Sequence, residues 1–244
     1  MSGTVLITGS TGGLGSAIAK RLAADGYHLA LHFHQHIEKA EELRASLPVN
    51  GKPHVILQAD LRNENDIHRL YTSLKEQGIK IGILINNAGV PSSGLSWKQS
   101  PEEWNEVFQV NTTAPWLMSQ QAIPMMRELG SGRIIYLSSV VAHRPPVGTG
   151  AYAASKAALE GLTRAQAIEL ARFGITVNCI APGYYNAGMI DAVEPDIRKE
   201  IENNTPLQRL GLSEELAASI AYLCSKEAAF TTGQVMHING GLYI

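Results

Sequence analysis

The sequence has little of what marks membrane, secreted or nucleic-acid-binding proteins. It contains two cysteines in 244 residues, Cys179 and Cys224, which lie in apolar stretches typical of buried thiols and outside any zinc-ligand or disulfide spacing. No apolar run reaches the ~18 residues that span a membrane, and no basic segment with a cleavage site opens the chain. The net charge is −2 and the basic residues are scattered, which argues against nucleic acid as a partner. We therefore expect a cytoplasmic protein without a bound metal.

What is present is the composition of a globular domain. Hydrophobic residues make up 45% of the chain and charged residues 17%, values typical of globular proteins. The length is sufficient for one large domain with a substantial core, and neither a repeat nor a change in composition divides the chain. We predict a single domain that comprises residues 1–244.

Apolar runs of strand length alternate with segments of helical periodicity. This alternation predicts an α/β fold, a doubly wound sheet of seven parallel strands with helices on both faces. Helical periodicity is expected in residues 17–25, 38–47, 101–129 and 152–172, and in segments that begin near residues 63 and 213. The expected strands are residues 4–8, 27–33, 55–59, 81–85, 135–139, 175–181 and 233–239.

A glycine-rich turn joins the first strand to the first helix. Glycines permit a tight turn and a close backbone approach, and the N–H groups at the start of a helix favour a pyrophosphate. A flexible turn is the alternative, but the strand–turn–helix context favours a dinucleotide site. The turn residues that we assign to this site are Gly9, Ser10, Thr11, Gly13, Leu14 and Gly15.

The ends of the second and third strands bear on which dinucleotide binds. A carboxylate at the end of the second strand would bind the 2′-hydroxyl of NAD, yet here His34, Gln35 and His36 precede the first carboxylate, Glu38. Because no carboxylate stands at this strand end, a 2′-phosphate would not be repelled there, and His34 or His36 can donate a hydrogen bond to that phosphate. NADP(H) is therefore favoured over NAD(H), unless both histidines lie on a solvated turn. Asp60, with Leu61 beside it, can accept from the adenine amine and can equally cap the next helix, and the two uses are compatible.

The fourth strand ends in Asn86-Asn87-Ala88-Gly89. Small residues leave room for a cofactor above the sheet, and an amide at a strand end can tie neighbouring strands together. We assign Asn87, Ala88 and Gly89 to the cofactor site, in a supporting role.

Tyr152, Lys156 and Ser139 are the candidate catalytic residues. A spacing of four places Tyr152 and Lys156 on one face of a helix, where one charge about 4 Å away can bring a tyrosine pKa of ~10 towards neutrality. Ser139, at a strand end, can donate a hydrogen bond to a carbonyl oxygen while the phenol exchanges its proton. Tyr-x-x-x-Lys by itself is more often a half-buried ring beside a solvated amine, and it is the order of the other motifs that favours catalysis.

Three further segments have two interpretations each. Asn111, inside the predicted helix 101–129, is either a solvent-facing amide or marks a helix distortion that frees a carbonyl to hold a water near Lys156. The loop 140–150 either lines a substrate mouth or is a plain connector. Residues 184–209 lack clear periodicity and predict an irregular substrate loop, which in a compact domain is more often functional than connecting.

Taken in order, these motifs resemble the short-chain dehydrogenase/reductase family over the full length of the chain. The resemblance implies the strand order 3-2-1-4-5-6-7. It also implies that Tyr152 is the general acid in reduction and Ser139 orients the carbonyl. Lys156 would lower the tyrosine pKa and hold the nicotinamide ribose, and Asn111 would anchor a relay water. The motifs are Thr8-Gly9-x-x-x-Gly13-x-Gly15, Asn86-Asn87-Ala88-Gly89, Asn111, Ser139, Tyr152-x-x-x-Lys156 and Pro182-Gly183, the last pair also at the cofactor.

Within this family, Leu210-Gly211 and the ending 232–241 are most similar to the 3-oxoacyl-(acyl-carrier-protein) reductases. That similarity implies an NADPH-dependent homotetramer that reduces a small-molecule or carrier-protein-bound 3-oxoacyl thioester, with Arg127, Arg133 and Arg172 as candidate carrier contacts. An NAD(P)-dependent alcohol or sugar dehydrogenase is one alternative. Another is a dinucleotide-binding subunit that forms a hetero-oligomer with an active paralogue.

The sequence departs from the pattern of these reductases in three ways. Gly12 stands where a basic residue is frequent in the glycine turn, and Ala187 stands where a threonine often binds the nicotinamide carboxamide. Tyr184-Tyr185-Asn186 makes the start of the substrate loop more aromatic. We therefore expect a specialised relative that acts on carrier-bound or unusual 3-oxoacyl groups.

Overall fold

The computed structural model describes residues 3–244, which form one parallel sheet between two layers of helices. Within these residues the strand order is β3-β2-β1-β4-β5-β6-β7, and each adjacent pair is parallel. The predicted doubly wound α/β sheet and its strand order are confirmed. The strands are β1 (Thr4–Ile7), β2 (Leu29–Phe33), β3 (Val55–Gln58), β4 (Ile81–Asn86), β5 (Gly132–Leu137), β6 (Ile175–Pro182) and β7 (Val235–Ile238).

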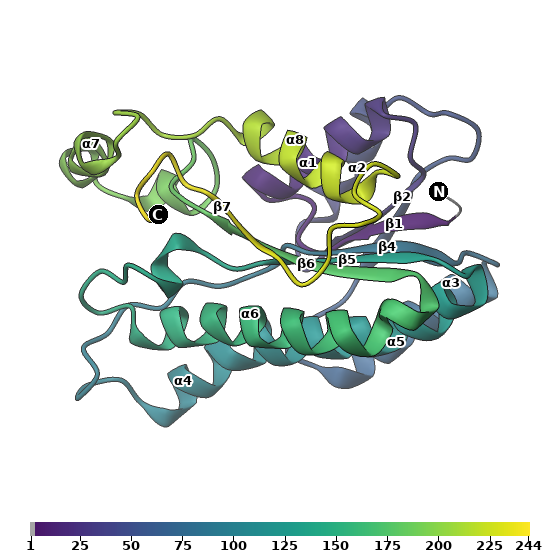
Figure 1. Ribbon diagram of the computed structural model, residues 1–244, viewed down its shortest axis with the longest axis horizontal. Helices are drawn as coiled ribbons and strands as arrows, with labels where there is room; N and C mark the ends of the chain where they lie inside the picture. Colours follow the sequence, from purple (N-terminus) through teal and green to yellow (C-terminus); the bar gives the residue numbers. More distant parts are fainter. Residues whose placement is uncertain (1–2) are drawn as a thin grey trace.

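The helices cover both faces of the sheet (Figure 1). One layer holds α1 (Gly13–Ala24), α2 (Ile37–Ser46), α7 (Pro195–Asn204) and α8 (Ser213–Cys224). The other layer holds α3 (Glu64–Glu76), α4 (Pro101–Phe108), α5 (Ala114–Leu129) and α6 (Gly150–Leu170). Among the described residues, no helix is both long enough and apolar enough to cross a membrane.

Strand β1 shows why one sheet separates two hydrophobic cores. Val5 and Ile7 pack with residues of α1 and α8, whereas Leu6 packs with residues of α3 and α5. Successive side chains of a strand point to opposite faces, so a strand covered on both faces is apolar throughout. This is why the central strands appear in the sequence as continuous apolar runs.

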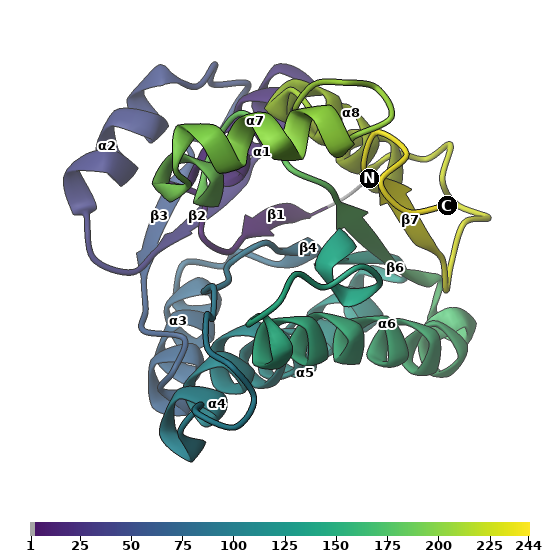
Figure 2. The same ribbon diagram turned by 90° about the vertical axis from the view of Figure 1, so that its left-hand side faces the viewer.

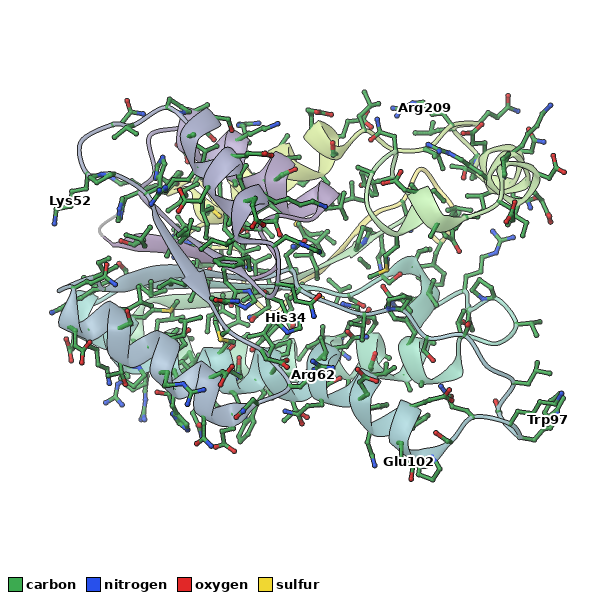
Figure 3. All side chains as sticks on the ribbon, turned by 180° about the vertical axis from the view of Figure 1, so that it is seen from behind. His34, Lys52, Arg62, Trp97, Glu102 and Arg209 are labelled. Atoms are coloured by element: carbon green, nitrogen blue, oxygen red, sulfur yellow. The ribbon has the colours of Figure 1, made fainter. Side chains whose placement is uncertain are left out.

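Because all strands are parallel, their carboxyl ends meet at one end of the molecule. Figure 2 views the molecule from this end, where α7 and the C-terminal tail also lie. The turn after β1, the loop from β4 to α4 and the segment after β5 open here. Trp97 projects into solvent from the β4–α4 loop and is 78% exposed (Figure 3).

The predicted helix 101–129 is helical throughout but changes geometry in the middle. Residues Gln109–Thr113 form a π-helical turn between α4 and α5. Asn111 lies in this turn and is completely buried. The predicted helix distortion is therefore confirmed, and the interpretation of Asn111 as a solvent-facing amide is wrong.

The stretch 184–209 is more regular than the sequence predicts. Residues Met189–Ala192 form a short 3₁₀ turn, and α7 follows at once with Pro195 in its first turn. Besides Pro195, the only apolar side chains of α7 are Ile197 and Ile201, so the apolar face of this helix is too short to give a clear helical periodicity, and none of its ten residues is buried. The prediction of an irregular segment throughout is therefore wrong.

Candidate active site

Two adjoining cavities lie at the carboxyl end of the sheet. The loop cavity, about 450 Å³, lies over the glycine-rich turn after β1. The tyrosine cavity, about 330 Å³, contains the side chain of Tyr152 in its wall. The two cavities adjoin because four residues line both, Leu14, Asn87, Gly89 and Met189.

Main chain forms the floor of the loop cavity. A Cβ atom on Gly15 would lie 2.2 Å from the carbonyl oxygen of Gly9, and one on Gly13 would lie 2.6 Å from the amide nitrogen of Gly188. Gly9 has a φ of 62°, in the left-handed region that favours glycine. The turn therefore closes on itself only when these positions lack side chains.

The start of α1 suits a negatively charged ligand. Gly12 is its N-cap and supplies no side-chain cap, and the first turn of α1 contains no acidic residue. The N–H groups at a helix start and the helix dipole favour a phosphate group. Together with the excluded Cβ positions, this start fits the pyrophosphate of a dinucleotide.

His32 is a part of this cavity that the sequence did not single out. Its Nδ1 accepts a hydrogen bond from the Gly9 N–H at 3.1 Å, and its Nε2 lies 3.1 Å from the carbonyl oxygen of Ala59, to which it donates. Burial lowers the pKa of His32 to about 4, so the ring is neutral at pH 7. The signal in the sequence is one polar residue within the apolar run Leu29–Phe33.

The end of the loop cavity beside β2 and β3, where the sequence predicts the adenosine and which we call the adenosine end, carries a compact charged group. Arg62 donates to the Asp60 carboxylate at 2.8 Å, and Nε2 of His34 lies 3.5 Å from it. The Arg62 guanidinium lowers the pKa of Asp60 to about 2. Figure 3 shows His34 and Arg62 near one another between the helical layers. Asn63, whose side chain accepts from the Asn65 N–H, caps α3, so the prediction that Asp60 caps this helix is wrong.

Most of the predicted cofactor residues line the loop cavity. Ser10 does not, because it is completely buried and its hydroxyl donates to the His32 carbonyl. Pro182 and Gly183 line the tyrosine cavity instead. The predicted residues in the loop cavity are Gly9, Thr11, Gly13, Leu14, Gly15, His34, His36, Asp60, Leu61, Asn87, Ala88 and Gly89, and those that the sequence missed include Arg62, Val90, Glu106, Val110, Gly188 and Met189.

Ser139, Tyr152 and Lys156 meet in the wall of the tyrosine cavity. The end of β5 delivers Ser139, whose hydroxyl accepts a hydrogen bond from the Val141 N–H at 3.2 Å. The first turns of α6 deliver Tyr152 and Lys156. The Lys156 ammonium donates to the carbonyl oxygen of Leu137 at 2.8 Å and lies 5.7 Å from the centre of the Tyr152 ring.

Asn111 lies behind these side chains and holds two segments together. Its amide accepts from the Val90 N–H at 2.8 Å and donates to the Val90 carbonyl at 2.9 Å. It also donates to the Ser155 hydroxyl at 3.1 Å, next to Lys156. The π turn thus brings Asn111 to the start of α6, next to Ser155, which lies 44 residues later in the chain.

The pKa values of Tyr152 and Lys156 are set mainly by burial. Burial raises the pKa of Tyr152, the nearby Ser139 hydroxyl opposes this rise, and Tyr184 adds to it. Burial lowers the pKa of Lys156 to about 8. The pKa of Tyr152 thus moves away from neutrality, and the prediction that Lys156 brings it down is wrong for this geometry, in which the ammonium points to Leu137.

Apolar side chains dominate the rest of the tyrosine cavity. The loop 140–150 contributes to its wall, so this loop is more than a plain connector. Ala187 also lines this cavity. The ring of Tyr185 packs against Gly211, where an added Cβ atom would lie 2.6 Å from the ring. Other apolar or aromatic side chains in the wall are Pro91, Val140, Val141, Pro146, Tyr184, Ile190 and Val193.

The three candidate arginines differ in their surroundings. Arg133 is buried and donates to the carbonyl oxygens of Gly132 and Ser225, so the prediction that it meets a carrier protein is wrong. Arg127 and Arg172 lie over the Phe173 ring, at 4.3 and 4.7 Å from its centre. Both lie at the far end of α6, about 30 Å along this 21-residue helix from Tyr152.

Neither cysteine contributes to the two cavities. Cys179 and Cys224 are buried, as predicted, and lie in separate hydrophobic cores. Across residues 3–244, no group of three or more His, Cys, Asp or Glu residues is arranged to hold a metal ion.

Comparisons with known proteins agree with this geometry. The family model described as enoyl-(acyl carrier protein) reductase matches residues 9–243. The chain is 34% identical over 244 residues to the 3-oxoacyl-(acyl-carrier-protein) reductase FabG of Staphylococcus aureus (strain N315), covering 100% of this chain and 99% of that protein. It is 39% identical over 238 residues to nodulation protein G of Rhizobium sp. (strain N33), covering 97% and 95%. A solved structure of a proposed gluconate dehydrogenase from Agrobacterium tumefaciens superposes with a TM-score of 0.94 at 28% identity, covering 99% and 96%.

Proposed function

The chain belongs to the short-chain dehydrogenase/reductase family, and from this membership we propose that it reduces a ketone to a secondary alcohol with NADPH. The favoured substrate is a 3-oxoacyl thioester on a carrier protein, and the product is the 3-hydroxyacyl thioester. The observation that carries the proposal is the meeting of Ser139, Tyr152 and Lys156 in one cavity beside the glycine turn.

In this proposal each side chain of the tyrosine cavity has one task. The Ser139 hydroxyl donates a hydrogen bond to the ketone oxygen, and the Tyr152 hydroxyl delivers a proton to the same oxygen. Lys156 holds the ribose of the dinucleotide and contributes positive charge, while Asn111 fixes the start of α6 and anchors a relay water. A bound nicotinamide supplies the hydride for the carbonyl carbon.

The protonation state of Tyr152 is compatible with the proposed reduction. Burial raises the pKa of the phenol from its ordinary value, so the hydroxyl is protonated at neutral pH and can act as a proton donor. Oxidation of an alcohol would need the phenolate at the same position. Assays in both directions separate the two reactions.

The lining of the tyrosine cavity supports an apolar acyl group. Lys156 is the one lysine or arginine among the described residues that line it, and its ammonium already donates to Leu137. A sugar or an aldonate requires several polar partners, whereas an acyl chain requires apolar contact. The name of the Staphylococcus aureus relative, a 3-oxoacyl-(acyl-carrier-protein) reductase, also supports an acyl substrate over a sugar.

The adenosine end of the loop cavity supports NADP(H). The segment after β2 presents His34, Gln35 and His36 in place of a carboxylate, and all three line the cavity. Asp60, which also lines it, is already paired with Arg62. A 2′-phosphate would thus meet imidazole and guanidinium groups where NAD-specific sites have an acid.

Carrier docking and assembly are part of the same proposal. Arg127 and Arg172 place two cations on the Phe173 ring, which suits an acidic partner, but they lie about 30 Å along α6 from Tyr152, so a carrier that docks there must reach the tyrosine cavity over that distance. A homotetramer is supported by exposed apolar side chains on one helical layer, namely Trp104, Trp116 and Ile168. Light scattering of the purified protein measures its mass, and a monomer would contradict this part.

The proposal is tested with a substrate panel. The purified chain is assayed with 3-oxoacyl thioesters and simple ketones, each with NADPH and NADH, and with secondary alcohols and sugar acids, each with NADP⁺ and NAD⁺. We expect the highest kcat/KM for a 3-oxoacyl thioester with NADPH. Faster turnover of a sugar acid with NAD would establish a dehydrogenase, and activity that appears only after addition of a paralogue would establish a supporting subunit.

The cofactor choice is tested by His34→Asp with His34→Asn as its control. The aspartate places an acid after β2, so we expect the Kd for NADPH to rise about tenfold or more while that for NADH falls. The asparagine lacks the charge and should affect both cofactors much less. A wild-type Kd that is lower for NADH than for NADPH would contradict the assignment.

A further inference from the structure

Glu160 is a buried carboxylate that the proposed proton transfer does not use. It lies one helical turn after Lys156 on α6 and is 6% exposed. Burying a carboxylate is costly unless hydrogen bonds and charges compensate it. We therefore expect the Glu160 carboxylate to have hydrogen-bond partners that compensate its burial.

The partners of Glu160 flank Ser139 on both sides. Oε1 of Glu160 accepts a hydrogen bond from the Ser138 hydroxyl at 2.8 Å and lies 2.8 Å from Nε2 of His143. Ser138 directly precedes Ser139, and His143 ends the 3₁₀ turn that Ser139 opens. One carboxylate oxygen thus holds the entry and the exit of the segment that carries the Ser139 hydroxyl.

The C-terminal tail holds His143 from the other side. The Tyr243 ring stacks on His143 with ring centres 4.5 Å apart, and His237 meets it edge-on at 4.8 Å. Next to His143, Arg144 donates to the carbonyl oxygen of Leu242 at 3.1 Å. The imidazole therefore has little freedom to leave Glu160.

We propose that Glu160 is a positioning residue that, through Ser138 and His143, keeps the Ser139 hydroxyl in its place beside Tyr152 in the wall of the tyrosine cavity. Its effect on rate rests on the proposed ketone reduction, but its effect on Ser139 does not. A shift of about 1 Å in a reacting group can lower a rate by about 10²-fold, so this support is worth measuring.

The informative change is Glu160→Leu, which keeps a similar volume and removes both hydrogen bonds. Ser138 retains a second acceptor, the carbonyl oxygen of Lys156 at 3.1 Å, so its hydroxyl is still paired. Glu160→Gln retains an acceptor oxygen and should rescue the function. Glu169→Gln removes an exposed glutamate from the same helix and is the control for charge.

We expect Glu160→Leu to lower kcat about tenfold to hundredfold with the Kd for the dinucleotide unchanged. Glu160→Gln should stay within about threefold of wild type, since the carboxamide oxygen still accepts. In a Ser139→Ala background Glu160→Leu should have little further effect, because Glu160 acts through Ser139. An equal loss in both backgrounds would overturn the proposal.

A titration tests the same claim without turnover. Ser139 opposes the rise in the Tyr152 pKa, so Glu160→Leu should raise this pKa in the direction that Ser139→Ala does. Carbon-13 NMR of labelled tyrosine measures it. An unchanged Tyr152 pKa would overturn the proposal, whereas a raised pKa in a chain that reduces no ketone would refute only the proposed reaction. If Glu160→Leu fails to fold, His143→Leu replaces it in both tests, with the same outcomes.

Discussion

The loop cavity and the tyrosine cavity adjoin, yet they are built from different parts of the chain. The loop cavity depends on main chain, since Cβ atoms on Gly13 and Gly15 would fall within 2.6 and 2.2 Å of backbone atoms. The tyrosine cavity depends on buried polar side chains, with Ser139, Lys156 and Glu160 held by hydrogen bonds. Changes in the first should therefore act on binding and folding, and changes in the second on rate.

Each region also contains one buried base, and the two bases differ in charge. His32, under the glycine turn, has a pKa lowered to about 4 and is neutral at pH 7, where it accepts from the Gly9 N–H. Lys156 has a pKa lowered to about 8 and is mostly charged at pH 7. The loop cavity is thus supported by an uncharged scaffold, and the tyrosine cavity contains a buried cation.

The largest effect is expected for Tyr152→Phe, which removes one oxygen from the tyrosine cavity. Loss of a general acid lowers kcat by about 10²- to 10⁴-fold. The dinucleotide Kd should not change, because the loop cavity is intact. Steady-state kinetics and a fluorescence titration of the reduced dinucleotide measure the two quantities.

Ser139→Ala is the companion variant to Tyr152→Phe, since it keeps the phenol and removes the other hydroxyl of the proposed pair in the same cavity. A smaller loss of kcat is expected. Turnover by Tyr152→Phe at the wild-type rate would show that another group delivers the proton, and a weakened dinucleotide Kd would show that the two cavities are not separable as described.

The sequence predicted the local motifs of both cavities well. A strand, a glycine turn and a helix in succession can be identified from neighbouring residues, and a spacing of four places Tyr152 and Lys156 on one face of α6. Asn111 was predicted for the same group, and the π turn that buries it was one of two interpretations.

The parts that the sequence did not predict depend on contacts between distant segments. Glu160 contacts His143 only once the loop after β5 has folded onto α6. His32, in β2, contacts Gly9, which follows the adjacent strand β1. The direction of the Tyr152 pKa shift depends on burial, which spacing along a helix does not reveal. The helix α7 was not predicted because, besides Pro195, it has only two apolar side chains, Ile197 and Ile201, which are too few for a clear helical periodicity.

The second prediction compares Gly15→Ala with Gly12→Ala, two changes in the same turn. A Cβ on Gly15 would collide with the Gly9 oxygen at 2.2 Å, whereas one on Gly12 would lie 3.4 Å from it, an ordinary contact. We expect Gly15→Ala to lower the free energy of unfolding by about 3 kcal/mol and to abolish dinucleotide binding. Gly12→Ala should cost no more than about 1 kcal/mol.

Denaturant unfolding and dinucleotide titration measure both variants. Equal losses of stability for Gly12→Ala and Gly15→Ala would mean that the close approach of backbone atoms is not what shapes the loop cavity. A stable Gly15→Ala variant that still binds the dinucleotide would contradict the conclusion that the loop cavity depends on main chain.

The third prediction concerns the stability of the fold at acid pH and follows from the lowered pKa of His32. Between pH 6.5 and 4 the unfolded chain takes up a proton on this residue that the folded chain does not, so stability falls as the pH falls. The loss attributable to His32 is about 2.5 kcal/mol across this window. His32→Asn can still accept from Gly9 and should not show it.

The measurement is the difference in unfolding free energy between wild type and His32→Asn from pH 7 to 4. Taking the difference cancels other acid-sensitive groups, such as Asp60 and Glu215, whose pKa values are lowered by their arginine partners. A difference that is independent of pH would show that His32 is not buried as a neutral ring.

The smallest effect is expected for Gly161→Ala, on the helix that carries Tyr152 and Lys156. Unlike Gly15, this glycine has no atom within 4 Å of where a Cβ would lie and no left-handed φ. Alanine is the better helix former by up to about 1 kcal/mol, so the variant should be slightly more stable with unchanged kcat. Thermal unfolding and kinetics measure this. A loss of stability would mean that a neighbouring copy packs against α6 at Gly161. Close approach of main-chain atoms would then exclude a side chain from the helix that carries Tyr152, as it does from the glycine turn.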